Sequence, residues 1–156
     1  MGYDLQAVIG GEEVLRAGAR ELPAARLVPI GQGLALMPMT DELFDSVAGG
    51  GDDRAMDFWR LPAGFAKTLA DWSTAGPLAY VEAEYFGGAG DQTAVVWDGG
   101  ATALGPLHEP EGRPTLPEGS PISQALRRLG AVAGAREDEF TAVGLDRHRS
   151  VEDWVA

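Results

Sequence analysis

The sequence predicts a single α+β domain, residues 1–156, built on an antiparallel or mixed sheet with helices packed against it. Three short apolar segments separated by turn residues occupy positions 78–107, which is typical of a β-meander. Positions 61–73 and 121–130 instead carry apolar residues at helical spacing. With 45% hydrophobic residues among 156, the chain has enough apolar surface to bury a core between these elements.

The meander is the expected centre of the sheet. Its strands are predicted at 78–86, 92–97 and 101–107, where β-branched and aromatic residues are common. Asp98-Gly99 is a strong signal for a tight turn between the second and third strands. The glycine-rich residues 87–91 predict a loop between the first and second. Three adjacent antiparallel strands are stable when one face is covered, so the sheet needs helices on it.

Two helices are expected to cover the meander. The first spans 61–73 with Pro62 near its start, and the second spans 121–130 with Ser120 as its cap and Pro121 in its first position. Their apolar stripes are more typical of core packing than of a cofactor site. The stripe residues are Leu61, Phe65, Leu69 and Trp72 in the first helix, and Ile122, Ala125, Leu126 and Leu129 in the second.

The N-terminal third predicts a further strand and two further helices. The strand is expected at Tyr3–Ile9, the first helix at 12–22, and one or two short strands at 25–39 with a kink at the Gly-Gln-Gly sequence. Thr40 is the expected N-cap of the next helix. Residues 49–53, Gly-Gly-Gly-Asp-Asp, predict a flexible loop.

The C-terminal part predicts shorter elements. Residues 108–119 contain three prolines and predict an extended loop, and residues 137–143 predict a short helix. Ser150 is the expected cap of a last helical turn that Trp154 would anchor.

Charge and residue types exclude several classes of function. The net charge of −12 argues against binding of nucleic-acid phosphates or of an anionic membrane, because both require clustered Lys and Arg. The absence of cysteine excludes disulfides, cysteine nucleophiles and thiolate metal sites. The sequence shows neither a signal-peptide pattern nor a stretch of about 18 apolar residues. A cytoplasmic protein without a cofactor or a resident metal is therefore expected.

A long acidic run marks the candidate functional surface. From Thr68 to Gly112 there is no Lys or Arg, whereas there are seven acidic residues. Strand alternation places Glu82, Glu84 and Phe86 on one face of the first meander strand, with neighbouring backbone positions roughly 6.5–7 Å apart. Asp91 and Gln92 follow at the mouth of the glycine loop. We expect these five residues to form a surface that attracts a basic partner.

Other roles of the acidic surface stay open at this point. It is compatible with a solvated sheet face, with contact to a basic protein, or with a small hydrolase that uses the paired carboxylates Glu82 and Glu84, with or without a metal ion. A concave pocket and a raised carboxylate pKa would favour the hydrolase. A further reading is self-association through a strand edge.

Two remaining motifs favour structure over chemistry. Gly87-Gly88-Ala89-Gly90 matches no phosphate-binding pattern, and a strand follows it where a helix N-terminus would be needed. His108 and His148 are the only histidines, and nothing in the local sequence around them predicts a zinc site.

Several segments of the C-terminal two-thirds carry a family resemblance: Phe58-Trp-Arg-Leu-Pro62, Gly76–Trp97, Pro121-Ile-Ser-Gln-Ala-Leu126, Asp138-Glu-Phe140, Gly144-Leu145 and Arg149–Trp154. Through them the chain resembles an uncharacterised family of small acidic bacterial proteins over residues 58–156, and the N-terminal third lies outside this resemblance. More loosely, in its small size, acidity and α+β character, the chain resembles the immunity proteins of bacterial polymorphic toxin systems. High Ala, Gly and Arg with a single Lys suggests an actinobacterial type of genome.

The immunity resemblance implies a tight complex with a cognate toxin domain and brings no catalytic residues. Combined with the acidic surface, it predicts a non-enzymatic protein-binding domain that neutralises a basic toxin by occluding its active site. The predicted partner-binding residues are Glu82, Glu84, Phe86, Asp91 and Gln92.

Overall fold

The computed structural model describes residues 2–49, 53–86, 89–110 and 117–156, and for Phe86 and Ala89 it describes the backbone alone. Within these residues the strands form a six-stranded sheet of order β2-β3-β1-β4-β5-β6, in which every neighbouring pair is antiparallel. The strands are β1 (Tyr3–Gly11), β2 (Val28–Pro29), β3 (Leu34–Pro38), β4 (Leu78–Phe86), β5 (Ala89–Asp98) and β6 (Ala101–Glu109).

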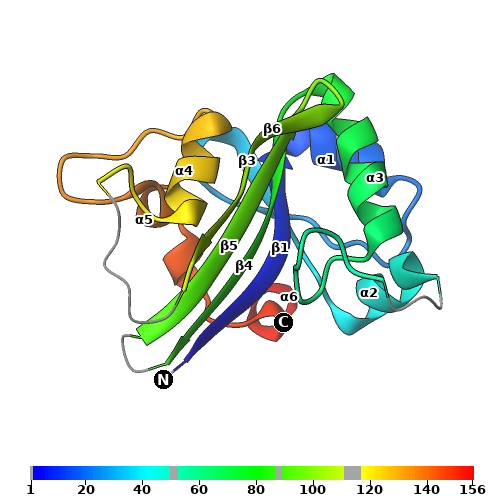
Figure 1. Cartoon of the computed structure of the whole chain (residues 1–156), viewed down its shortest axis with the longest axis horizontal. Helices are drawn as coiled ribbons and strands as arrows, with labels where there is room; N and C mark the ends of the chain where they lie inside the picture. The colour runs from blue at the N-terminus through cyan, green and yellow to red at the C-terminus, as the bar shows by residue number, and fades with distance from the viewer. Residues whose placement is uncertain (1, 50–52, 87–88, 111–116) are drawn as a thin grey trace.

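Helices cover both faces of this sheet, so the molecule has three layers (Figure 1). The N-terminal helices α1 (Glu12–Ala19), α2 (Asp41–Ala48) and α3 (Ala63–Trp72) pack on one face, which we call the N-terminal face. The helices α4 (Pro121–Arg128), α5 (Glu139–Ala142) and α6 (Val151–Val155) pack on the other, the C-terminal face. The described residues also include the 3₁₀ turns η1 (Gly31–Gly33) between β2 and β3, η2 (Ser73–Ala75) between α3 and β4, and η3 (Leu145–Arg147) between α5 and α6.

The α+β class, the antiparallel sheet and the meander are confirmed. β4, β5 and β6 follow one another as expected, and α3 and α4 lie against them. The predicted caps are also correct: the hydroxyl oxygens of Thr40, Ser120 and Ser150 accept hydrogen bonds from backbone N–H groups three residues later. At the tight turn, Gly99 and Gly100 both have positive φ.

Several boundaries differ from the expected ones. The loop predicted at 87–91 is shorter, because pairing with β4 extends β5 back to Ala89. The helix predicted at 12–22 ends at Ala19, and the segment 25–39 forms a two-residue β2, a 3₁₀ turn and β3. The flexible loop predicted at 49–53 falls mostly on residues 50–52, which lie outside the described part of the chain.

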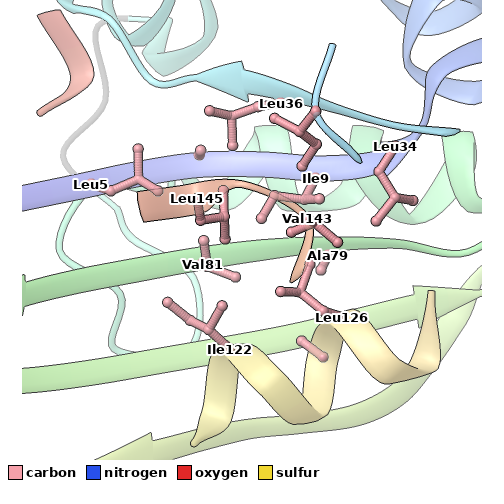
Figure 2. Close-up of a cluster of buried hydrophobic side chains, with 14 of the residues drawn as sticks. Leu5, Ile9, Leu34, Leu36, Ala79, Val81, Ile122, Leu126, Val143 and Leu145 are labelled. Carbon is pink, nitrogen blue, oxygen red and sulfur yellow. The ribbon is translucent and has the colours of Figure 1, made fainter. Parts of the chain in front are cut away.

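The strands alternate between two cores. On the C-terminal face, side chains of β1, β3 and β4 meet α4 and the segment around Val143 and Leu145, and Figure 2 shows this cluster. On the N-terminal face, Val8, Tyr80 and Val95 pack against α1, α2, α3 and Phe58. Residues next to each other in a strand therefore enter different cores.

β1 is an inner strand of the sheet. It lies between β3 and β4, and beyond the end of β3 it pairs with the C-terminal segment, where the Asp4 N–H donates to the Arg149 carbonyl at 2.7 Å. Residues 5–10 of β1 are all buried as a result.

Both edge strands are interrupted. β6 contains Gly105-Pro106, and its register with β5 shifts on either side of Val96 of β5. Arg128 donates a hydrogen bond to the Ala103 carbonyl of β6 at 3.0 Å. β2 has two residues, one of them Pro29, whose carbonyl accepts a hydrogen bond from Arg147 at 3.0 Å. Such features disfavour the addition of a further strand at either edge.

Candidate functional site

The N-terminal face becomes polar where the strands run beyond α1 and α3, near the N-terminus (Figure 1). Asp4 in β1 lies directly opposite Glu84 in β4, and Glu84 lies directly opposite Asp91 in β5. We call these three residues the acidic row. Asp4 and Glu84 are exposed, and Asp91 is half-buried. Alternation puts their side chains on the same face as Tyr80 and Val95, so one sheet face changes from apolar core to acidic surface.

The acidic row brings like charges together. Directly opposed residues of adjacent strands have Cβ atoms only about 5 Å apart, and like charges at that distance are destabilising. His108 of β6 contacts Asp91, with Nε2 at 2.9 Å from Oδ2. In the described part of the chain no Lys or Arg forms an ion pair with the row. The row therefore carries an unbalanced negative field.

Glu82 lies on the same face as Glu84 but has an internal role. Its carboxylate accepts hydrogen bonds from the backbone N–H groups of Trp59 and Arg60, both at 2.7 Å, and from the Tyr80 hydroxyl at 2.8 Å. Burial raises the pKa of Glu82 above its ordinary value of 4.5, and the three hydrogen bonds oppose that rise. The carboxylate expected to face a partner is thus already engaged within the chain.

The segment that Glu82 holds is a short hairpin-like loop, residues 53–63, which we call the Trp59 loop. The Ala63 N–H donates to the Asp53 carbonyl at 3.1 Å, and the Ala55 N–H donates to the Leu61 carbonyl at 2.9 Å. Phe58 enters the core with its ring 5.0 Å from the ring of Tyr80. The next side chain along the loop, Trp59, is 66% exposed.

Gln92 lies on the opposite face from the acidic row. It is buried, its Oε1 accepts a hydrogen bond from the Ile122 N–H at 3.0 Å, and its Nε2 donates to the Tyr85 hydroxyl. Burial raises the pKa of Tyr85. Gln92 therefore binds the start of α4 to the sheet, and its side chain lies on the opposite face of the sheet from those of Glu82, Glu84 and Asp91.

Of the five predicted partner-binding residues, the structure brings Glu84 and Asp91 together on an exposed surface. Glu82 adjoins them but is occupied, and Gln92 faces away. The side chain of Phe86 lies outside the described residues, as do Gly87 and Gly88 of the glycine loop.

Sequence reasoning missed Asp4, Trp59 and His108. Asp4 is far from the acidic run in sequence and joins it because β1 pairs with β4. A zinc site would need both His108 and His148, and the His148 ring contacts Trp154 in the C-terminal layer, at a centroid distance of 4.7 Å. Within the described ranges there is no group of three or more His, Cys, Asp or Glu residues that could hold a metal ion.

Two further features of the described residues bear on function. A pocket of about 250 Å³ lies between the start of α2, α6 and Arg26, and neither Glu82 nor Glu84 lines it. None of the helices described has the length and apolar character that a membrane span needs.

Comparisons with protein families, with curated proteins and with solved structures gave no match to this chain.

Proposed function

We propose that this chain is a non-enzymatic protein-binding domain, and most specifically an immunity protein that occludes the active site of a basic toxin in the cytoplasm. The observation that carries the proposal is the acidic row, in which Asp4, Glu84 and Asp91 stand directly opposite one another on three adjacent strands. A protein keeps opposed like charges at a cost in stability. A partner with Lys and Arg would turn that cost into binding energy.

The electrostatics of the whole chain support a basic partner. The net charge is −12, and the row lies at the exposed end of a sheet face. A one-signed surface of this kind speeds association with an oppositely charged protein and makes it sensitive to salt. It repels nucleic acid and anionic membrane.

The position of Glu82 disfavours the hydrolase alternative. A paired-carboxylate mechanism needs two carboxylates free to exchange protons with a substrate. Both oxygens of Glu82 already accept hydrogen bonds from the chain itself, so Glu84 has no free catalytic partner on its own strand. The pKa of Glu82 is raised, but by burial beneath the Trp59 loop.

Self-association through a strand edge is disfavoured by the interruptions of β2 and β6. The partner is therefore expected to bind through side chains on a sheet face, and not by adding a strand.

The test is co-expression with the product of the neighbouring reading frame, followed by co-purification and measurement of affinity at low and moderate salt. The variant D4K/E84K reverses two exposed charges of the row. D71K/D98K is its matched control, because it makes the same change of net charge at exposed positions outside the row. We expect D4K/E84K to abolish the complex and D71K/D98K to retain it.

Equal affinity of the two double variants for that product would contradict the proposal, and so would a complex whose affinity does not change with salt. Because Asp4 and Glu84 are exposed, both variants are expected to fold, and circular dichroism checks this.

A further inference from the structure

Trp59 stands out among the described apolar side chains. Three large ones are conspicuously exposed: Met56 at 36%, Trp59 at 66% and Val132 at 73%. Two of the three, Met56 and Trp59, belong to the Trp59 loop. Tryptophan is a large apolar residue that contributes strongly to protein interfaces when it is presented on a surface.

The loop that presents Trp59 has an unfavourable backbone. Met56 and Asp57 have φ values of 53° and 63°, and the Phe58 N–H donates to the Ala55 carbonyl at 2.9 Å, which closes a tight turn. Residues other than glycine rarely adopt positive φ, and Met has no side-chain group that would favour it. Strained turns of this kind persist where the surrounding structure enforces them, and they concentrate at binding sites.

Three contacts enforce this turn. Phe58 is buried against Tyr80, and Glu82 accepts hydrogen bonds from the N–H groups of both Trp59 and Arg60. The Arg60 side chain lies over the Phe44 ring, 5.1 Å from its centroid, and forms an ion pair with Asp41. Because the backbone of Trp59 is fixed before binding, a partner would lose little conformational entropy in engaging the indole ring.

Trp59 also adjoins the acidic row. Its backbone N–H donates to Glu82, and Glu84 of the row is the next residue along β4 on the same face. The Arg60 guanidinium also lies 5.8 Å from the centroid of the indole ring, but it forms an ion pair with Asp41. In the described part of the chain, the charge near this loop that has no Lys or Arg in an ion pair with it is therefore that of the acidic row. A second copy of this chain is a poor occupant, because it would bring two acidic rows and two net charges of −12 together.

We infer that Trp59 is the anchor of the interface with a basic partner, and this inference rests on the proposed function. The indole ring enters an apolar pocket of the partner, and Lys or Arg residues around that pocket pair with Asp4, Glu84 and Asp91. A buried aromatic anchor within a rim of charge pairs is the usual arrangement of a strong interface.

The experiment measures the affinity of W59A, V132A and D4K/E84K for the product of the neighbouring reading frame. V132A is the matched control, because Val132 is equally prominent but follows α4 in the C-terminal layer. We expect W59A to weaken binding at least about 30-fold and V132A to leave it unchanged. Tryptophan fluorescence provides a second readout: binding should shift the emission of the native chain to shorter wavelength, and W59F should remove most of that shift.

The outcomes separate this inference from the proposed function. If D4K/E84K abolishes binding while W59A binds as tightly as the native chain, the anchor is refuted and the acidic row stands. If the native chain does not bind that product, both proposals fall. If the native chain elutes as a dimer on gel filtration and W59A elutes as a monomer, Trp59 binds a second copy of this chain and the inference is wrong.

Discussion

The two faces of the sheet differ most at the end where β1 begins and β4 ends. On the C-terminal face, the Tyr3 hydroxyl donates to the Leu145 carbonyl at 3.0 Å, and buried Gln92 binds the start of α4. On the N-terminal face, Asp4 and Glu84 face solvent. At this end the same strands are thus covered on the C-terminal face, the closed side, and open to solvent on the N-terminal face, the open side. Two residues that are neighbours in a strand can therefore differ completely in exposure.

The difference shows what decides whether a polar residue in a strand has a structural role or is exposed for binding. Alternation along the strand selects the face, but a distant segment decides whether that face is covered. Glu82 and Glu84 share a face, and the Trp59 loop covers only the first of them. Availability for binding is therefore set by loops and helices far away in sequence.

The largest expected effect comes from the variant Gly90→Ala, which adds a side chain on the closed side of the sheet. An added Cβ at Gly90 would overlap the Tyr85 ring and lie 2.5 Å from the Glu84 carbonyl oxygen, so the β4–β5 pairing must shift. We expect a loss of about 3 kcal/mol in the free energy of unfolding, measured by urea denaturation. Gly64→Ala in α3 is the control: its Cβ meets no atom within 4 Å, and the substitution should be neutral or slightly stabilising. Equal stability of the two variants would show that the closed side has room.

The next effect separates the two glutamates. Glu82→Ala removes the carboxylate that accepts hydrogen bonds from the Trp59 and Arg60 N–H groups, which lowers the free energy of unfolding. It also removes a charge that is unfavourable to bury, which restores part of that free energy. We expect about 1–2 kcal/mol of destabilisation and faster hydrogen exchange at both amides. Glu84→Ala, at an exposed position of the same strand, should change stability by less than about 0.5 kcal/mol. Unchanged exchange in Glu82→Ala would mean that the carboxylate does not hold the loop.

Acidity provides a smaller test of the same carboxylate. Because burial raises the pKa of Glu82 in the folded chain, the folded state binds this proton more tightly than the unfolded state does. The stability that this group contributes is complete below its unfolded pKa and is lost as the pH rises through its folded pKa. The native chain should therefore lose stability relative to Glu82→Gln as the pH rises from about 4 towards neutrality. A difference between the two that stays constant or grows in favour of the native chain would contradict this assignment.

The smallest expected effect concerns the open side. Glu84→Gln removes the central charge of the acidic row, between Asp4 and Asp91, and should stabilise the chain by about 0.5 kcal/mol. The gain should shrink as salt is added, because exposed charges are screened. Thermal unfolding at two ionic strengths measures it. Destabilisation at low salt would show that the row has a favourable partner and is not a repulsive surface.

Local features of the fold could be predicted from the sequence because they depend on neighbouring residues. Thr40, Ser120 and Ser150 were identified as caps because a hydroxyl needs only the N–H three positions later. The strands of the meander and the stripes of α3 and α4 likewise follow from short-range patterns.

The site could be predicted only in part, because its geometry depends on distant contacts. The roles of Glu82 and Gln92 are set by partners 22 to 30 positions away, and nothing in strand alternation indicates which face a loop will cover. Asp4 joins Glu84 across a sequence separation of 80 residues, through a strand pairing that the N-terminal sequence does not specify. The carboxylates could be listed from the sequence, but their neighbours could not.

The central place of β1 has a consequence for how the chain folds during synthesis. β1 is made before all of its partners: β3 follows soon after, but β4 begins only at Leu78, and the segment that pairs with Asp4 contains Arg149. Until then the apolar residues of β1 lack their final neighbours. Long-range antiparallel pairing of this kind slows folding and exposes a nascent strand to non-native contacts. The pairing of β1 is therefore complete only after residue 149 has emerged from the ribosome.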